Sequence, residues 1–178
     1  KPNILEQDFR TGKSNSKWST DVTNLYYKNN RFYLCVILDL YNREILSYIM
    51  SSKNDNQLVI STINKATSRR ENMVGVILHS DQGSQYTTEY YSKLLLSKGI
   101  IQSMSRRGNC LDNAPVECFF SHLKSELIYT TKFSSEEEMK QGIEEYIRFY
   151  NQERIQQKLN NLSPITYKLK EKTLNLSH

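Results

Sequence analysis

The sequence has little of what marks a membrane or secreted protein. Its 178 residues include only three cysteines, Cys35, Cys110 and Cys118, an odd number without the spacing of a disulfide framework. No apolar run approaches the roughly 20 residues that cross a bilayer, and the first residues do not form a signal-peptide pattern. We therefore expect no membrane association and a reducing compartment, the cytoplasm.

Several kinds of catalytic or metal site are also missing. There is no Gly-rich phosphate loop and no convincing Ser-His-Asp or Cys-His unit. Cys110, Cys118 and His122 suggest zinc only weakly, because a fourth ligand and a Cys-x-x-Cys pair are both missing. Small buried thiols are the favoured interpretation. Neither an internal repeat nor a low-complexity tract is evident.

Composition and length indicate one domain with a single real core. Apolar residues make up 38% of the chain, the formal net charge is +5 and the isoelectric point is about 9.0. A mildly basic balance is a weak indication of nucleic-acid binding, since many proteins share it.

The order of apolar patterns predicts an α/β fold. Residues 1–17 form a polar, extended leader, and strands are predicted over 18–23, 32–38 and 45–50, the last two as a hairpin. A helix from about 55, a strand over 74–78, a helix over 88–98 and a strand over 100–103 follow. We expect a mixed sheet with helices on both faces, a core over 18–151, and a C-terminal tail over 152–178 with one short helix.

Three acids stand in three well-marked contexts. Asp21 lies in an alternating strand pattern, Asp81 directly follows an apolar run, and Glu117 lies near the start of a helix. On that helix Asp112 or Asn113 is a natural N-cap, and Pro115 is tolerated in the first turn. Apolar residues recur with helical spacing at Val116, Phe119, Phe120, Leu123 and Leu127.

At roughly 100° per residue, Asn113, Glu117 and Lys124 follow one rim of this apolar stripe, where a residue lining a cleft would lie. The simpler alternative is that Glu117 only stabilises the helix dipole. That alternative does not account for Asp21 and Asp81, so we favour a shared site.

Three carboxylates at one site require a counter-charge. Two of them about 4 Å apart repel by roughly 4 kcal/mol at an effective dielectric near 20. A bound Mg²⁺ or Mn²⁺ removes this repulsion, and two ions about 4 Å apart support in-line displacement at phosphorus. The acids therefore predict metal-dependent phosphoryl transfer.

At these residues the chain resembles a known family. It is similar to the DDE-type integrase-core catalytic domain of bacterial insertion-sequence transposases, the second-reading-frame type related to retroviral integrases. The matching stretches are 17–23, 79–86, 105–120 with Lys124, Tyr150-Asn-Gln-Glu-Arg154 and Leu162-Ser-Pro164.

The resemblance implies a ribonuclease-H-like, mixed five-stranded sheet flanked by helices. It implies Asp21, Asp81 and Glu117 as catalytic residues that bind two Mg²⁺ or Mn²⁺ ions. The implied activity is DNA strand cleavage by water, then joining by a 3′-hydroxyl. The implied partners are transposon ends, target DNA and further copies of the chain in a synaptic complex, at the nucleoid. Lys124 is expected to contact DNA near the scissile phosphate.

Other residues are weaker candidates. Arg106 and Arg107 form a basic loop that we interpret as a DNA contact, although a solvated loop explains it too. We also expect Asn113 and Arg154 to bind DNA, while capping alone already explains Asn113. For Asp39 we favour a structural or supporting role over that of a fourth metal ligand. For His79, a hydrogen-bonded position at the end of a strand explains the residue at least as well as a role in positioning water or phosphate.

Two departures and two alternatives stay open. Gln82 stands where a basic residue is frequent, and Gln156 where histidine is common. The helix-turn-helix expected before the core is not in the chain, so we expect this chain alone to lack recognition of the element's ends. The alternatives are a nuclease of the same fold without strand joining, and an inactive DNA-binding or assembly module.

Overall fold

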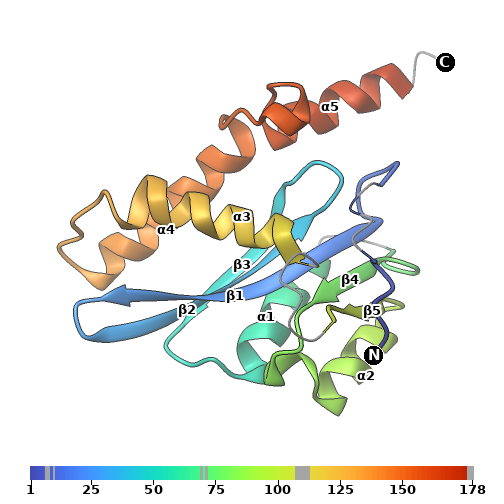
Figure 1. Ribbon diagram of the computed structural model, residues 1–178, viewed down its shortest axis with the longest axis horizontal. Coiled ribbons are helices and arrows are strands. Elements are labelled where there is room, and N and C mark those ends of the chain that lie inside the picture. Colours follow the sequence, from blue (N-terminus) through green and yellow to red (C-terminus); the bar gives the residue numbers. More distant parts are fainter. Residues whose placement is uncertain (7–8, 10, 69, 71, 107–112, 176–178) are drawn as a thin grey trace.

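The structure, a computed structural model, describes residues 1–6, 9, 11–68, 70, 72–106 and 113–175. Three strands come first, strands then alternate with helices as far as β5, and helices follow (Figure 1). The elements in chain order are β1 (Lys17–Tyr27), β2 (Asn30–Asp39), β3 (Ile45–Ser51), α1 (Asn56–Thr67), β4 (Ile77–Ser80), η1 (Ser84–Tyr86), α2 (Glu89–Ser97), β5 (Ile101–Met104), α3 (Ala114–Leu123), η3 (Lys124–Ile128), α4 (Glu136–Gln152), η4 (Gln157–Leu159) and α5 (Pro164–Asn175).

The described strands form one mixed sheet in the order β3-β2-β1-β4-β5. β1, β2 and β3 are antiparallel neighbours, whereas β4 pairs with β1 and β5 pairs with β4 in parallel. The parallel pairs are joined through helices, as parallel connections require. The predicted mixed five-stranded sheet flanked by helices is confirmed.

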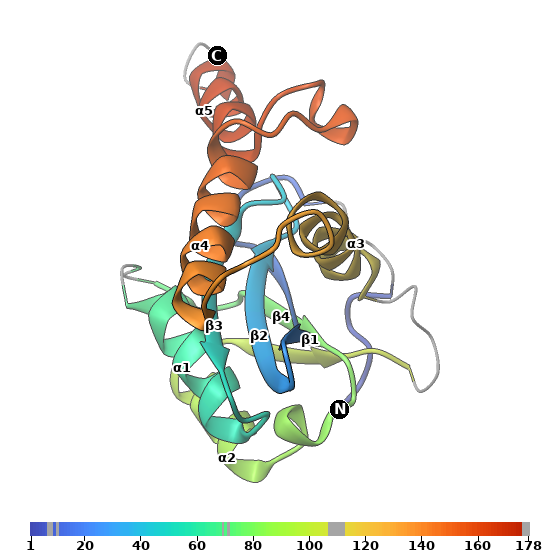
Figure 2. The same ribbon diagram turned by 90° about the vertical axis from the view of Figure 1, so that its left-hand side faces the viewer.

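Each face of the sheet carries its own apolar core. α1 and α2 cover one face, over a cluster that includes Trp18, Ile37 and Leu78. α3 and α4 cover the other face, over a cluster that includes Leu25 and Val36. Figure 1 shows the two helix layers on opposite sides of the strands, and Figure 2 views α3 almost along its axis beside α4.

The fourth strand is shorter and later than the predicted span of 74–78. Val74 is 77% exposed, and Gly75 takes a positive φ of 83° in a turn, so neither belongs to the sheet. The backbone N–H of Gly75 donates to the carbonyl of Gly99 at 2.9 Å. The apolar run therefore supplied both a turn and a strand, and pairing begins only at Ile77.

The two ends of the chain pack on this framework. In the leader, Leu5 is 1% exposed, and its N–H donates to Ser103 Oγ at 3.2 Å. In the tail, Lys168 Nζ lies 2.9 Å from Glu44 Oε2, which holds α5 against the turn between β2 and β3. α5 is twelve residues long and extends beyond the sheet (Figure 1). Among the described residues, no helix is both long and apolar enough to cross a membrane.

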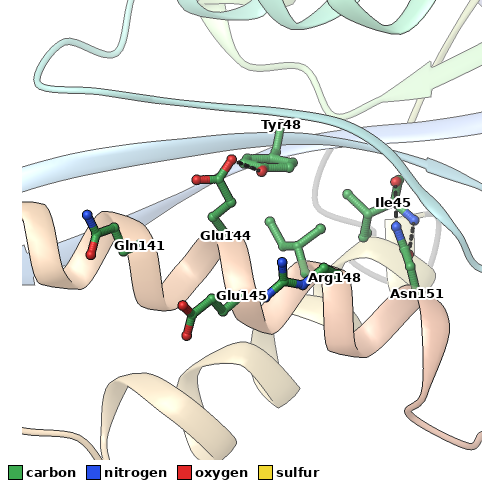
Figure 3. Close-up of a pocket in the computed structure, with 8 residues that line it drawn as sticks. Ile45, Tyr48, Gln141, Glu144, Glu145, Arg148 and Asn151 are labelled. Carbon is green, nitrogen blue, oxygen red and sulfur yellow. Dashed lines mark hydrogen bonds between the residues drawn. The ribbon is translucent and has the colours of Figure 1, made fainter.

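α4 is held to the edge strand β3 by polar contacts as well as by its apolar face. Asn151 exchanges two hydrogen bonds with the backbone of Ile45, at 2.8 and 2.9 Å. Tyr48 Oη donates to Glu144 Oε1 at 3.1 Å (Figure 3). These contacts line a hollow of about 440 Å³ between β3 and α4.

Candidate active site

Sheet register places the two aspartates side by side. The parallel pairing of β1 and β4 ends with Ser19 opposite His79. Asp21 and Asp81 each lie two residues further along. Adjacent strands are about 4.8 Å apart and side chains repeat every second residue, so the two carboxylates project from neighbouring positions on one face. Both side chains are half-buried.

The third acid reaches this edge on α3. Glu117 is in the first turn of the helix and is exposed. The helix lies over β1 because Val116, Phe119 and Leu123, all fully buried, pack into the core between it and the sheet. The predicted apolar stripe therefore orients Glu117 at the margin of the sheet.

Asn113 fixes the start of α3 against β1. Its side chain makes no cap hydrogen bond to the helix. Its Oδ1 instead accepts from Ser19 Oγ, and its Nδ2 donates to the carbonyl of Thr20 at 3.3 Å. The amide is 2% exposed. It thus ties the helix that carries Glu117 to the two residues before Asp21. The capping interpretation is wrong for the side chain, and DNA contact by Asn113 stays a prediction.

The three carboxylates act on one another electrostatically. Burial raises the pKa of Asp21 to about 7, and the nearby charges of Asp81 and Glu117 add to the rise. Burial and the charge of Asp81 also raise the pKa of Glu117. Lys124 lowers the pKa of Asp21, so its positive charge acts on this acid. Negative charge here is therefore only partly compensated by the protein.

The acids do not form a closed ligand set as they lie. Within the described residues, no three His, Cys, Asp or Glu side chains are grouped so as to hold a metal ion. Asp21 Oδ1 accepts from the N–H of Val22 at 2.7 Å, and Asp81 Oδ1 accepts from the N–H of Gly83 at 2.9 Å. Each aspartate therefore keeps a second oxygen outside these hydrogen bonds.

Lys124 marks a change in helix winding. Residues Lys124–Ile128 form a π turn, in which the N–H of Tyr129 donates to the carbonyl of Lys124 at 2.9 Å. Such single π turns are frequent at functional sites. The sequence predicted a regular helix through Leu127. The wider turn leaves Leu127 only partly buried, whereas Leu123 is fully buried.

The other candidate residues have different surroundings. Arg106 is exposed just after β5, and Arg107 lies outside the described residues. Arg154 forms a forked ion pair with Glu126, with nitrogen–oxygen distances of 2.9 and 2.6 Å, and its side chain is 19% exposed. The structure thus gives Arg154 a structural partner, and DNA contact by either arginine stays a prediction.

Asp39 and His79 both hold the framework in place. Asp39 is fully buried and accepts from Ser14 Oγ at 2.7 Å and from the N–H of Asn15 at 2.9 Å. His79 is also buried, with its ring nitrogens 2.8 Å from Ser103 Oγ and 3.0 Å from Ser105 Oγ. The structural interpretation of both residues agrees with these contacts.

Two further points concern residues around α3. Sequence reasoning missed Ser19, because a serine in a strand gives no sign of the helix that will meet it. Of the weak zinc candidates, Cys118 Sγ lies 3.4 Å from His122 Nε2, and Cys110 is outside the described residues.

Comparisons with known proteins agree with this fold. A family model described as "Integrase core domain" matches residues 12–110, and a second model of the same description matches 117–174. Two solved structures share the fold at low sequence identity. The integrase in an intasome of simian T-cell lymphotropic virus, bound to a PP2A regulatory subunit, has a TM-score of 0.71 at 20% identity and covers 83% of this chain and 52% of its own. The HTLV-2 integrase catalytic core, solved with magnesium, has a TM-score of 0.67 at 18% identity, over 87% and 97%.

Curated relatives come from bacteria. The putative transposase InsK of insertion element IS150 from Escherichia coli K12 is 44% identical over 94% of this chain, which spans 59% of that protein. A transposase-like protein of Haemophilus influenzae is 42% identical over 93% of this chain and 76% of its own length. Because the integrase core family model matches more than half of this chain, the chain belongs to the integrase core domain family.

Proposed function

We propose that this chain is the catalytic core of a DNA transposase that cleaves DNA strands and joins a 3′-hydroxyl to target DNA. The observation that carries the proposal is the in-register placement of Asp21 and Asp81 with Glu117 over them on α3. Relatives that are named transposases support it, as does the family match.

The donor set fits Mg²⁺ or Mn²⁺. Asp21, Asp81 and Glu117 offer only oxygen ligands, which hard divalent cations prefer. The raised pKa values of Asp21 and Glu117 reflect burial and mutual repulsion, which a cation would relieve. When bound, such ions polarise the phosphate and activate the attacking oxygen. Two ions are our proposal.

The chain's own residues then have separate tasks. Asp21 and Asp81 would hold the cations from the sheet, and Glu117 would hold them from the helix. Asn113 ties the start of α3 to β1, and we expect Lys124, whose charge acts on Asp21, to contact a DNA phosphate. We propose transposon ends and target DNA as substrates, and assembly with further copies of the chain at the nucleoid in the cytoplasm.

The test is a strand-joining assay with a precleaved transposon end and a target plasmid, in Mg²⁺ and in Mn²⁺. We expect joined products from the wild type. Glu117→Gln should lower the rate about a thousandfold or more, because several kcal/mol of metal-assisted stabilisation are lost. Glu145→Gln makes the same chemical change at an exposed position on α4 and should act like the wild type.

Each other result selects an alternative. Nicked but never joined DNA would favour a nuclease of this fold. Bound DNA without any product in either metal would favour an inactive binding module. Full activity of Glu117→Gln would overturn the assignment of the acids.

A further inference from the structure

A second hollow, of about 530 Å³, lies on α3 beside the candidate active site. Its walls are the first turns of α3, the turn between β2 and β3, and the segment after α4. Hydrogen-bond donors are concentrated there, and no Asp or Glu is among its described lining residues. The nitrogen and hydroxyl donors that line it are Arg43, His122, Tyr150, Arg154, Gln156, Gln157 and Lys158. We call this hollow the cationic pocket.

Arg43 is the clearest sign of a missing ligand. In the described part of the chain, its guanidinium has no hydrogen bond and no carboxylate partner. Burial lowers its pKa, so the protein encloses this charge without neutralising it. Its backbone is fixed in the turn, with a φ of 63° and an N–H that donates to the carbonyl of Asp39 at 2.8 Å. A half-buried guanidinium of this kind is costly unless an anion completes it.

Gln156 gives an independent indication. Its Nε2 is buried and forms no well-formed hydrogen bond within the described structure, and only a weak polar contact relates its side chain to Tyr150. Gln156 is held rigidly, because its backbone forms a bridge with Leu162. Leaving a buried N–H donor unpaired costs about 1–3 kcal/mol. An acceptor that enters the pocket would recover that cost.

The hollow between β3 and α4 shows the contrast (Figure 3). Its lining includes both acidic and basic side chains, Glu144, Glu145 and Arg148 among them. Its Tyr48 and Asn151 have their hydrogen bonds completed within the protein. In the cationic pocket Arg154 is likewise paired, with Glu126, but Arg43 and Gln156 Nε2 have no such partner within the described residues.

The position of the pocket relative to Glu117 suggests which anion it takes. Cys118, which lines the pocket, follows Glu117 directly and so projects about 100° around α3. A DNA strand held at the acids would pass along this adjacent face of the helix. The acids themselves repel phosphates, so cations close to them must supply attraction.

We propose that the cationic pocket binds a phosphate group of the DNA backbone, with Arg43, Gln156 and Lys158 as its donors. The proposal deepens the function proposed above and rests on it for the identity of the DNA. Arg43 supplies a planar fork suited to two phosphate oxygens, Gln156 a buried N–H, and Lys158 an exposed charge at the rim.

The first test measures DNA binding to a short duplex in EDTA, as a function of salt. Neither metal nor joining is needed for this readout. We expect Arg43→Gln and Lys158→Gln each to lower the slope of log affinity against log salt by about one, as loss of one phosphate contact does. Arg148→Gln removes the same charge from the exposed face of α4 and should leave the slope unchanged. Lys158 is exposed, so its variant tests the pocket without risk to folding.

The second test separates DNA from free phosphate. Inorganic phosphate, added at constant ionic strength, should raise the Tm of the wild type and of Arg148→Gln, but not of Arg43→Gln. A phosphate response with unchanged DNA slopes would assign the pocket to free phosphate and overturn the DNA contact. If Arg43→Gln and Lys158→Gln behave like Arg148→Gln in both tests, the proposal that the cationic pocket binds phosphate would be overturned. If Arg43→Gln and Lys158→Gln lower the salt slope as expected but the wild type joins no strands, only the proposed function would be overturned.

Discussion

Two sites of opposite charge lie along adjacent faces of α3, and each contains polar groups that have no partner within the described residues. On one face, Glu117 meets the aspartates, and the pKa values of Asp21 and Glu117 are raised because negative charges gather there. On the other face, Arg43 and Gln156 offer donors without acceptors. In the hollow against α4, by contrast, Tyr48 pairs with Glu144, and Asn151 pairs with the backbone of Ile45. Binding chemistry is therefore indicated by polar groups that folding leaves incomplete, rather than by the size of a cavity.

The largest expected effect comes from removing Phe119, a core side chain of α3 that supports both sites. Phe119 is fully buried, and its ring centroid lies 4.9 Å from that of Tyr150, which lines the cationic pocket. Phe119→Ala should lower the free energy of unfolding by about 3–5 kcal/mol, the usual cost of such a cavity. Urea unfolding measures it. Leu96→Ala, at a 78% exposed site, is the control. A loss below about 1 kcal/mol at Phe119 would mean that α3 is not seated as described.

The acidic face alone should respond to Asp21→Asn, with a sign that depends on metal. Because the pKa of Asp21 is raised to about 7, its contribution to stability is greatest below its ordinary value and is lost as pH rises through 7. At pH 8 in EDTA the asparagine variant should therefore be more stable, by about 1–3 kcal/mol. Millimolar Mg²⁺ should raise the stability of the wild type more than that of Asp21→Asn. Thermal unfolding in both buffers decides this, and an equal gain from Mg²⁺ in both proteins would count against the metal site.

Asn113→Ala should sharpen the distinction between the faces. It leaves Ser19 and the Thr20 carbonyl without partners, at a cost of about 1–3 kcal/mol in unfolding free energy. We expect weaker stabilisation by Mn²⁺ and slower joining, with the response to inorganic phosphate intact. Ser19→Ala removes the same contact from the strand side, so the two effects should not add in the double variant. Full additivity would show that Asn113 does not act through β1.

The smallest effect should come from Glu126 behind the cationic face. Hydrogen bonding from Arg154 lowers the pKa of Glu126, so this stabilisation is present above the ordinary glutamate value near 4.5 and is lost as pH falls. The pair is partly exposed and is worth less than about 1 kcal/mol. Glu126→Gln should therefore lose less stability than the wild type between pH 7 and pH 3, and should bind phosphate more tightly because Arg154 is released. If stability falls with pH equally in the wild type and in Glu126→Gln, the stabilising pair between Glu126 and Arg154 would be contradicted.

Local pattern was enough to predict the framework of the acidic face. Alternation in β1 and the apolar stripe of α3 set which way Asp21 and Glu117 point, and both patterns are short-range. The same reasoning misplaced β4, because Val74 looks like a strand residue but precedes a glycine turn. An isolated apolar run does not show where its pairing partner begins.

The cationic face could not be predicted in this way. Arg43 comes from a hairpin turn and Gln156 from beyond α4, more than a hundred residues later, and only tertiary packing brings them to one cavity. Asn113 was predicted to cap its own helix. Its actual partner, the hydroxyl of Ser19, is likewise distant in sequence and could not be predicted from local pattern. The π turn at Lys124 also has no signature in apolar spacing.

The pairing of Ser19 with His79 has a consequence for how this protein can change. Side chains alternate between the faces of a strand, so a single residue inserted or deleted within β4, between Ile77 and Ser80, would move Asp81 to the opposite face of the sheet. Asp81 would then face α1 and α2, out of reach of its partner acids. A change of length inside this four-residue strand is thus more damaging than most substitutions of its residues.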